Sequence, residues 1–195
     1  MVEPPKTNAW IIFLMRGRKY FYEKEFLNAY DYLSESIYLS KFQGSSKENY
    51  EAYFLRAIIN REWYFYEDAI HDFRLSIKAK PEFFAYYEKS NIYLIQKEYK
   101  KAINDLTKAL KLKPNDFNSL LNRGACNYEI GRYKKAINDF NKAEKIKLDT
   151  DLFFNRGLCY SKLKNYKSAI SDFTLSNNLG YKKGDIFFQR GIAKS

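Results

Sequence analysis

The chain has 195 residues, of which 46% are hydrophobic and 18% aromatic, so it can bury a substantial core. Its formal net charge is +11, and the excess lies in one half: residues 1–95 hold 13 basic and 13 acidic residues, whereas residues 96–195 hold 21 and 10. No apolar run reaches 18 residues, and the short run 9–15 lacks a cleavage site, so we expect neither a membrane-spanning helix nor a secretory signal.

In chain order, the sequence predicts helices separated by short connections, with no strand. Residues 1–7 form a short extension, and residues 42–47 form an insertion after the second helix. The first helix contains the run from Trp10 to Met15, which is apolar on all sides. Pro81 and Pro114 end two later helices, because proline cannot continue a helix. The expected helices are 8–22, 25–41, 47–62, 66–79, 83–96, 99–112, 116–130, 133–147, 150–163, 166–178 and 184–194.

A repeated pattern divides these helices into pairs. The second helix of each pair carries an alanine near its start, at Ala29, Ala69, Ala102, Ala136 and Ala169, with separations of 40, 33, 34 and 33 residues. Each first helix carries a small residue near its middle, at Gly17, Ala57, Ser90, Gly124, Gly157 and Gly191. Small residues at fixed places let two helices approach closely. A period near 34 predicts an α-solenoid of stacked helix pairs.

This arrangement resembles the tetratricopeptide repeat over about residues 8–195. The resemblance implies an all-α fold, a right-handed superhelix of five antiparallel helix pairs plus a sixth first helix, and a single solenoid domain over 8–195. The chain departs from the family pattern in three features: the stretched connection at 43–47, the lack of a proline after the fourth repeat, and the residue type immediately before the small position of each first helix. A cation stands where the family usually has a large aliphatic residue, immediately before the small position.

Those cations recur in all six repeats, at Arg16, Arg56, Lys89, Arg123, Arg156 and Arg190. One interpretation is a row of ligand-binding arginines. The other is a structural ladder, because aspartates recur as regularly on the second helices, at Asp72, Asp105, Asp139 and Asp172. We favour the ladder, which predicts hydrogen bonds from Arg123 and Arg156 to repeat aspartates such as Asp139 and Asp172.

The family resemblance implies that the first helices line a concave groove. Apolar residues three before the small position would face it, together with nearby asparagines. An apolar ladder of this kind suits an extended peptide or an amphipathic helix; alternatively, these side chains only pack against their neighbours. The first-helix row of ligand candidates is Leu14, Phe54, Tyr87, Asn91, Leu121, Asn122, Phe154, Asn155 and Phe188. The carboxylate clamp of chaperone-binding relatives is disfavoured, because Tyr87 and Asp151 replace two of its cations.

Lysines recur on the second helices of the C-terminal half, at spacings that place them on the convex side. This basic ridge consists of Lys100, Lys101, Lys108, Lys111, Lys134, Lys135, Lys142 and Lys145. The ridge is either a solvated face or a docking surface for an acidic protein. Nucleic acid is the weaker option, because base stacking needs exposed aromatics and packing accounts for most of them here.

Catalytic chemistry is not indicated. The single histidine, His71, has no triad or zinc pattern around it, and we expect no cofactor, no metal and no enzymatic activity. Cys126 and Cys159 occupy equivalent places 33 residues apart, which favours core residues in a reducing setting over a disulfide. The favoured function is therefore a protein–protein interaction scaffold.

We expect this scaffold to be a structural subunit of a larger intracellular assembly, whether cytoplasmic, cytoskeletal or ciliary, and not to be secreted. Its partners would be other proteins, one of them acidic, and they would cover the terminal helices 8–22 and 184–194. Two alternatives stay open. One is a transient adaptor that binds peptides in its groove, and the other is a nucleic-acid-binding solenoid that uses the basic half.

Overall fold

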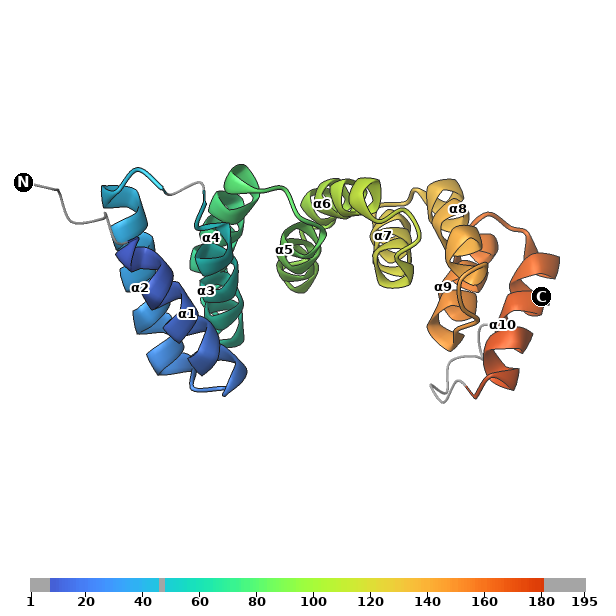
Figure 1. Ribbon diagram of the computed structural model, residues 1–195. Helices are drawn as coiled ribbons and strands as arrows, with labels where there is room; N and C mark the ends of the chain where they lie inside the picture. The colour runs from blue at the N-terminus through green and yellow to red at the C-terminus, as the bar shows by residue number, and fades with distance from the viewer. Residues whose placement is uncertain (1–7, 46–47, 181–195) are drawn as a thin grey trace, which may run out of the picture. The chain divides into compact units, whose positions relative to one another are not determined.

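The computed structural model describes residues 8–45 and 48–180, and this part of the chain contains ten α-helices and no strand (Figure 1). The all-α prediction is confirmed, with helix ends displaced by at most three residues. The eleventh expected helix, 184–194, lies outside the described residues. The helices are α1 (Ala9–Tyr22), α2 (Phe26–Phe42), α3 (Tyr50–Glu62), α4 (Tyr66–Ala79), α5 (Phe83–Ile95), α6 (Tyr99–Leu112), α7 (Phe117–Glu129), α8 (Tyr133–Glu144), α9 (Thr150–Lys162) and α10 (Tyr166–Asn178).

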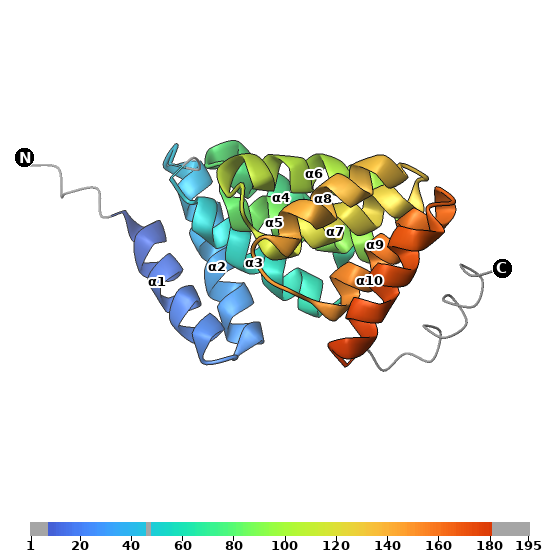
Figure 2. The ribbon, with the colours of Figure 1, turned by 90° about the vertical axis from the view of Figure 1, so that its right-hand side faces the viewer.

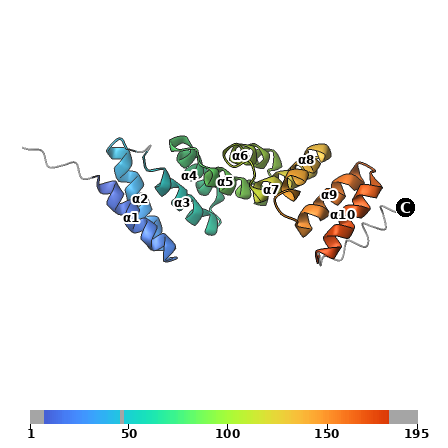
Figure 3. The same cartoon turned by 45° about the vertical axis from the view of Figure 1, so that its right-hand side comes forward.

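The helices form pairs, as the repeat predicts. Helix α1 contacts α2, α3 contacts α4, α7 contacts α8, and α9 contacts α10. In Figures 2 and 3, α1 lies beside α2, and α9 lies beside α10. Successive pairs are joined through contacts of α2 with α3, α6 with α7, and α8 with α9. Two compact units divide the chain, an N-terminal unit that ends at Ile92 and a C-terminal unit that begins at Tyr93, so the division falls within α5.

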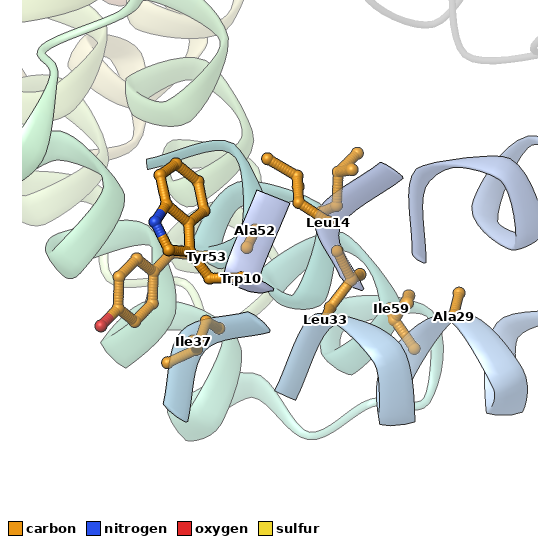
Figure 4. Packing of buried hydrophobic residues seen from close by; sticks show 9 residues of the cluster. Trp10, Leu14, Ala29, Leu33, Ile37, Ala52, Tyr53 and Ile59 are labelled. Atoms are coloured by element: carbon orange, nitrogen blue, oxygen red, sulfur yellow. The ribbon is translucent and has the colours of Figure 1, made fainter. Parts of the chain in front are cut away.

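The core of the N-terminal unit is built from α1, α2 and α3. Its buried cluster consists of Trp10, Leu14, Ala29, Leu33, Ile37, Ala52, Tyr53, Leu55 and Ile59 (Figure 4). Buried polar groups at its edge bond to one another: Ser36 Oγ donates to the Trp10 carbonyl oxygen at 2.7 Å, and Asn49 Nδ2 donates to Ser36 Oγ at 3.0 Å. These bonds tie α1 and α2 to the start of α3, since unpaired polar groups here would be costly.

In the C-terminal unit, two glycines set the distance between paired helices. A methyl group on Gly124 would lie 2.6 Å from Phe140 Cε1, and one on Gly157 would lie 2.6 Å from Phe173 Cε1. Both phenylalanines are fully buried. The small position of the repeat therefore makes room for the large ring of the partner helix, as the sequence pattern predicts.

The turn inside each of the five hairpins has one residue in the left-handed region at the same place. Four of these residues carry side chains, Lys24, Tyr64, Lys97 and Lys164, with φ between 58° and 65°, and the fifth is Gly131. The next residue donates its amide to a carbonyl near the end of the first helix, as Arg132 N does to Asn127 O at 2.7 Å. This geometry closes the helix and starts the reversal of the chain.

Candidate functional site

Three arginines bind the aspartate of their own second helix through two hydrogen bonds each. Arg123 Nε donates to Asp139 Oδ2 at 2.9 Å, and its Nη2 donates to Oδ1 at 2.6 Å. The corresponding distances from Arg156 to Asp172 are 2.8 and 2.9 Å, and Arg56 binds Asp72 in the same way. Such bidentate pairs are the strong form of a guanidinium–carboxylate contact. The structural-ladder prediction is thus confirmed for Arg123 and Arg156.

The remaining guanidinium nitrogen reaches the second helix of the preceding repeat. Arg56 Nη1 donates to Ser34 Oγ and Arg123 Nη1 donates to Thr107 Oγ1, both at 3.1 Å. Arg156 Nη1 donates to Asn141 Oδ1 at 2.7 Å and to Glu144 Oε2 at 2.5 Å. Burial opposes the charge of Arg156, but its bonds to Asp172 and Glu144 outweigh burial, so its pKa is raised. Each arginine therefore joins three helices.

The ends of the arginine row differ from its middle. Arg16 is exposed, and its Cζ lies 5.8 Å from the centre of the Tyr32 ring, because Tyr32 stands where later repeats have aspartate. Lys89 is buried, and Arg190 lies outside the described residues.

The apolar members of the first-helix row belong partly to the core. Leu14 is buried. The rings of Phe54 and Phe154 are half-buried, and each has its centre 5.8 Å from a core ring, Phe73 or Phe173. In the row as a whole, Tyr87 stacks on Phe83, Leu121 packs at the edge of the C-terminal core, and Phe188 lies outside the described residues.

The asparagines of the row are half-buried. Asn91 Nδ2 donates to Glu88 Oε2 at 3.4 Å in the N-terminal unit. Asn122 on α7 and Asn155 on α9 lie on contacting helices of the C-terminal unit, each next to an apolar member of the row, Leu121 or Phe154. In that unit the row therefore presents two equivalent apolar–amide pairs, and a ligand at this face stays a prediction.

All eight residues of the basic ridge are exposed, on α6, on α8 and just after α8. Lys101 pairs with Glu98, and its Nζ lies 5.4 Å from the centre of the Tyr93 ring. Within residues 8–45 and 48–180, six ridge lysines have no carboxylate at ion-pair distance: Lys100, Lys111, Lys134, Lys135, Lys142 and Lys145. The ridge thus keeps most of its positive charge available to solvent or to a partner.

Two equivalent pockets adjoin the ridge at successive hairpin turns of the C-terminal unit. The first has a volume of about 410 Å³ and is lined by Tyr99, by Lys100 and Lys101, and by Ile130 from the next repeat. The second has a volume of about 330 Å³, and Tyr133, Lys134, Lys135 and Leu163 take the corresponding places. Lys97 and Glu98 also line the first pocket, and Arg132 also lines the second, so each turn pocket combines an aromatic ring, an aliphatic side chain and three cations.

A third, polar pocket of about 340 Å³ lies between α6, α7 and α8. Its lining includes Thr107, Arg123, Asn127, Arg132, Lys135 and Asn138. Sequence reasoning missed Arg132 and Asn138 as site residues. One signal in the sequence could have indicated the pocket. Leu110 on α6 occupies the repeat position that Glu144 occupies on α8, so α6 supplies no carboxylate there.

Helix α1 carries an apolar face outside the core. Trp10 and Leu14 are buried, but Ile11, Ile12 and Met15 expose 37%, 50% and 62% of their surface. The residues that correspond to Ile12 in later repeats, Ala52 on α3 and Leu152 on α9, are fully buried. The exposure on α1 follows because no helix pair precedes it among the described residues.

The described residues offer no metal centre, since no group of three or more His, Cys, Asp and Glu side chains comes together among them. Cys126 and Cys159 are free and buried, as expected for core residues. Burial raises the pKa of each thiol to about 12, so both stay protonated and unreactive at neutral pH. None of the helices in the described ranges has the length and apolarity to cross a bilayer.

Comparison with family models identifies the repeat. A model described as TPR repeat matches residues 91–131, and one described as tetratricopeptide repeat matches residues 117–150 and 150–179. No curated protein matches the chain in sequence.

Solved structures support the same fold. The TPR protein YrrB, described as having an unusual peptide-binding site, aligns with a TM-score of 0.84 at 17% identity, over 95% of this chain and 94% of that one. MamA from Desulfovibrio magneticus RS-1 aligns with a TM-score of 0.74 at 20% identity, over 87% and 94%. MamA AMB-1 aligns with a TM-score of 0.78 at 15% identity, over 92% and 97%. At these identities the likeness shows the fold.

Proposed function

The chain belongs to the tetratricopeptide-repeat family, and from that premise we propose that it is a protein–protein interaction scaffold whose C-terminal unit binds an acidic protein. The observation that carries the proposal is the basic ridge, with six lysines unpaired among the described residues and two turn pockets beside it. A positive surface attracts and orients an acidic partner.

The turn pockets specify the partner further. Tyr99 and Ile130 line one pocket, and Tyr133 and Leu163 line the other, each beside three cations. Apolar side chains within an acidic segment would fit this combination, because the pockets bury them while the cations pair with flanking carboxylates. The peptide-binding site named for YrrB is consistent with a peptide partner here.

We further propose that the scaffold is a constitutive subunit, with residues 8–195 forming one solenoid. The exposed face of Ile11, Ile12 and Met15 favours burial against another protein, because contiguous apolar surface is rarely left in water. The reduced, buried thiols of Cys126 and Cys159 suit an intracellular compartment, where disulfides are rare.

Charge reversal on the ridge tests the acidic partner. In the full chain, Lys100→Glu with Lys134→Glu should weaken binding of a ten-residue poly-glutamate peptide by tenfold or more, about 1.4 kcal/mol. The matched control is Lys41→Glu with Lys78→Glu, which changes the same charge at exposed sites of the N-terminal unit. Equal losses of affinity in both variants would show that the net charge of the chain, and not the ridge, determines binding of the peptide.

Two further measurements separate the alternatives. Tighter binding of a single-stranded RNA than of the peptide at matched salt would favour the nucleic-acid function instead. Sedimentation of the purified chain addresses the constitutive subunit, for which we expect self-association through the α1 face. A monomer at high concentration would favour a transient adaptor.

A further inference from the structure

We propose that the polar pocket between α6, α7 and α8 binds the side-chain carboxylate of an Asp or Glu residue in the acidic partner. The inference rests on the proposed function, because it names the group that the C-terminal unit recognises. The lining of the polar pocket lies apart from the first-helix row. Arg132 and Lys135 also line the second turn pocket, whereas Arg123, Asn127 and Asn138 line neither turn pocket.

The neighbouring repeat shows what such a pocket holds. Arg156 Nη1 donates to Glu144 Oε2 at 2.5 Å, in addition to its bidentate pair with Asp172. Arg123 is the equivalent residue one repeat earlier, with the same pair to Asp139. Its Nη1 meets Thr107 Oγ1, whereas Leu110 stands where Glu144 would be. The Arg156 site thus carries its own second carboxylate, and the Arg123 site does not.

The third bidentate arginine provides a second comparison. Arg56 Cζ lies 5.7 Å from the centre of the Tyr30 ring, so an aromatic side chain covers that guanidinium. Ile103 occupies the position of Tyr30 in the Arg123 repeat, and it lines the pocket of about 340 Å³. Arg123 thus lines a pocket, whereas Arg56 meets the Tyr30 ring and Arg156 meets Glu144.

The charge of the pocket suits an anion. Arg123, Arg132 and Lys135 contribute three positive charges, and Asp139 contributes one negative charge. Arg132 and Lys135 are exposed, and no acidic side chain of the described part lies at ion-pair distance from either. Two cations at the mouth can therefore pair with an incoming anion without first breaking a bond.

A peptide offers the pocket a second group besides its carboxylate. The lining residue Asn127 is 4% exposed, and its Oδ1 has no donor within the described part of the chain. The residue that brings the carboxylate also has a backbone N–H, which can donate to such an acceptor.

The test compares two pairs of substitutions in the full chain. Arg132→Ala with Lys135→Ala removes two lining cations, and we expect about tenfold weaker binding of the ten-residue poly-glutamate peptide. Lys41→Ala with Lys78→Ala removes the same charge from exposed positions of the N-terminal unit, outside both the ridge and the pocket. It should change affinity about twofold or less. Equal effects would overturn the inference. Because Arg132 and Lys135 also line the second turn pocket, a tenfold loss supports the polar pocket only together with the result for the Asn138 variants.

A second pair of variants fills the pocket without removing a cation. Asn138 is exposed and lines the pocket, so Asn138→Glu places a carboxylate there and should weaken peptide binding. Asn138→Gln is the neutral control and should bind as the unsubstituted chain does. Unchanged binding in Asn138→Glu, with the fold verified by circular dichroism, would contradict the proposal.

Sodium acetate separates failure of this inference from failure of the proposed function. At ionic strength matched with sodium chloride, acetate should shift the Nε–H resonance of Arg123 in the full chain but not in Asn138→Glu. If poly-glutamate fails to bind and this shift persists, the partner is wrong and the carboxylate pocket stands. If the peptide binds through the ridge and acetate causes no shift, the carboxylate pocket is wrong.

Discussion

The α1–α2 and α9–α10 pairs use a cation at the same repeat position in different ways. In α9–α10, Arg156 is buried, binds Asp172 twice and reaches Glu144 in the preceding repeat. In α1–α2, Arg16 is exposed and lies over the ring of Tyr32. The position therefore tolerates an arginine for two reasons: a carboxylate compensates it where it is buried, and water with a ring suffices where it is exposed.

The N-terminal and C-terminal units also differ in the surface that they leave to a partner. Helix α1 exposes Ile11, Ile12 and Met15, whereas α6 and α8 expose the lysines of the basic ridge. Association through α1 would depend on apolar area and be insensitive to salt, while association through the ridge would weaken as salt screens the charges. Salt dependence would therefore distinguish the two proposed modes of association.

The largest predicted effect separates the two arginines. Arg156→Ala should lower the free energy of unfolding by about 3–5 kcal/mol, because it leaves the Asp172 carboxylate buried without its partner. Arg16→Ala should lower it by about 0.5–1 kcal/mol, the range of an exposed cation–π contact. Urea denaturation of both variants measures the difference. Similar losses would show that burial does not distinguish the two ends of the row.

The second prediction concerns the thiols of Cys126 and Cys159 in the C-terminal unit. They occupy the repeat position that Ile59 occupies in the N-terminal unit. Folding raises the pKa of Cys126 and Cys159 from 9.0 to about 12. The folded state therefore holds protons that the unfolded state loses, and stability should fall as pH rises above 9. The expected loss is about 1.4 kcal/mol per thiol at pH 10.

Urea denaturation of the full chain at pH 8 and pH 10 checks this sign. The double variant Cys126→Ala with Cys159→Ala is the control, and its stability should decrease less over the same interval. Native thiols should also resist iodoacetamide at pH 8. Rapid alkylation, or the same pH slope in the control, would contradict the assigned burial.

The smallest predicted effect lies in the turns, which the two regions share. Lys24 and Lys164 have φ of 63° and 59°, so Lys24→Gly and Lys164→Gly should each raise stability by about 0.5–1 kcal/mol. Gly131→Lys is the reciprocal change and should lower stability by a similar amount, because Gly131 has φ of 73°. Thermal denaturation compares the three variants. If all three changed stability in the same direction, backbone strain would be excluded as the cause.

Local sequence was sufficient to predict the helices and the arginine ladder. The small residue, the following alanine and the turn recur at one period, and neighbours three and four residues apart set the faces of a helix. The Arg123–Asp139 pair followed for the same reason, because both residues occupy fixed places within one helix pair.

Contacts between pairs decided what the repeat pattern could not. Leu14 is buried and Phe54 is half-buried at the same repeat position, because different neighbours pack against them.

The polar pocket beside Arg123 depends on two residues of the preceding repeat, Ile103 and Leu110. Ile103 occupies the repeat position of Tyr30, and Leu110 occupies that of Glu144. The period itself predicts which positions correspond. Only the packed structure shows which side chains fill the space between them, because that space depends on residues far apart in sequence.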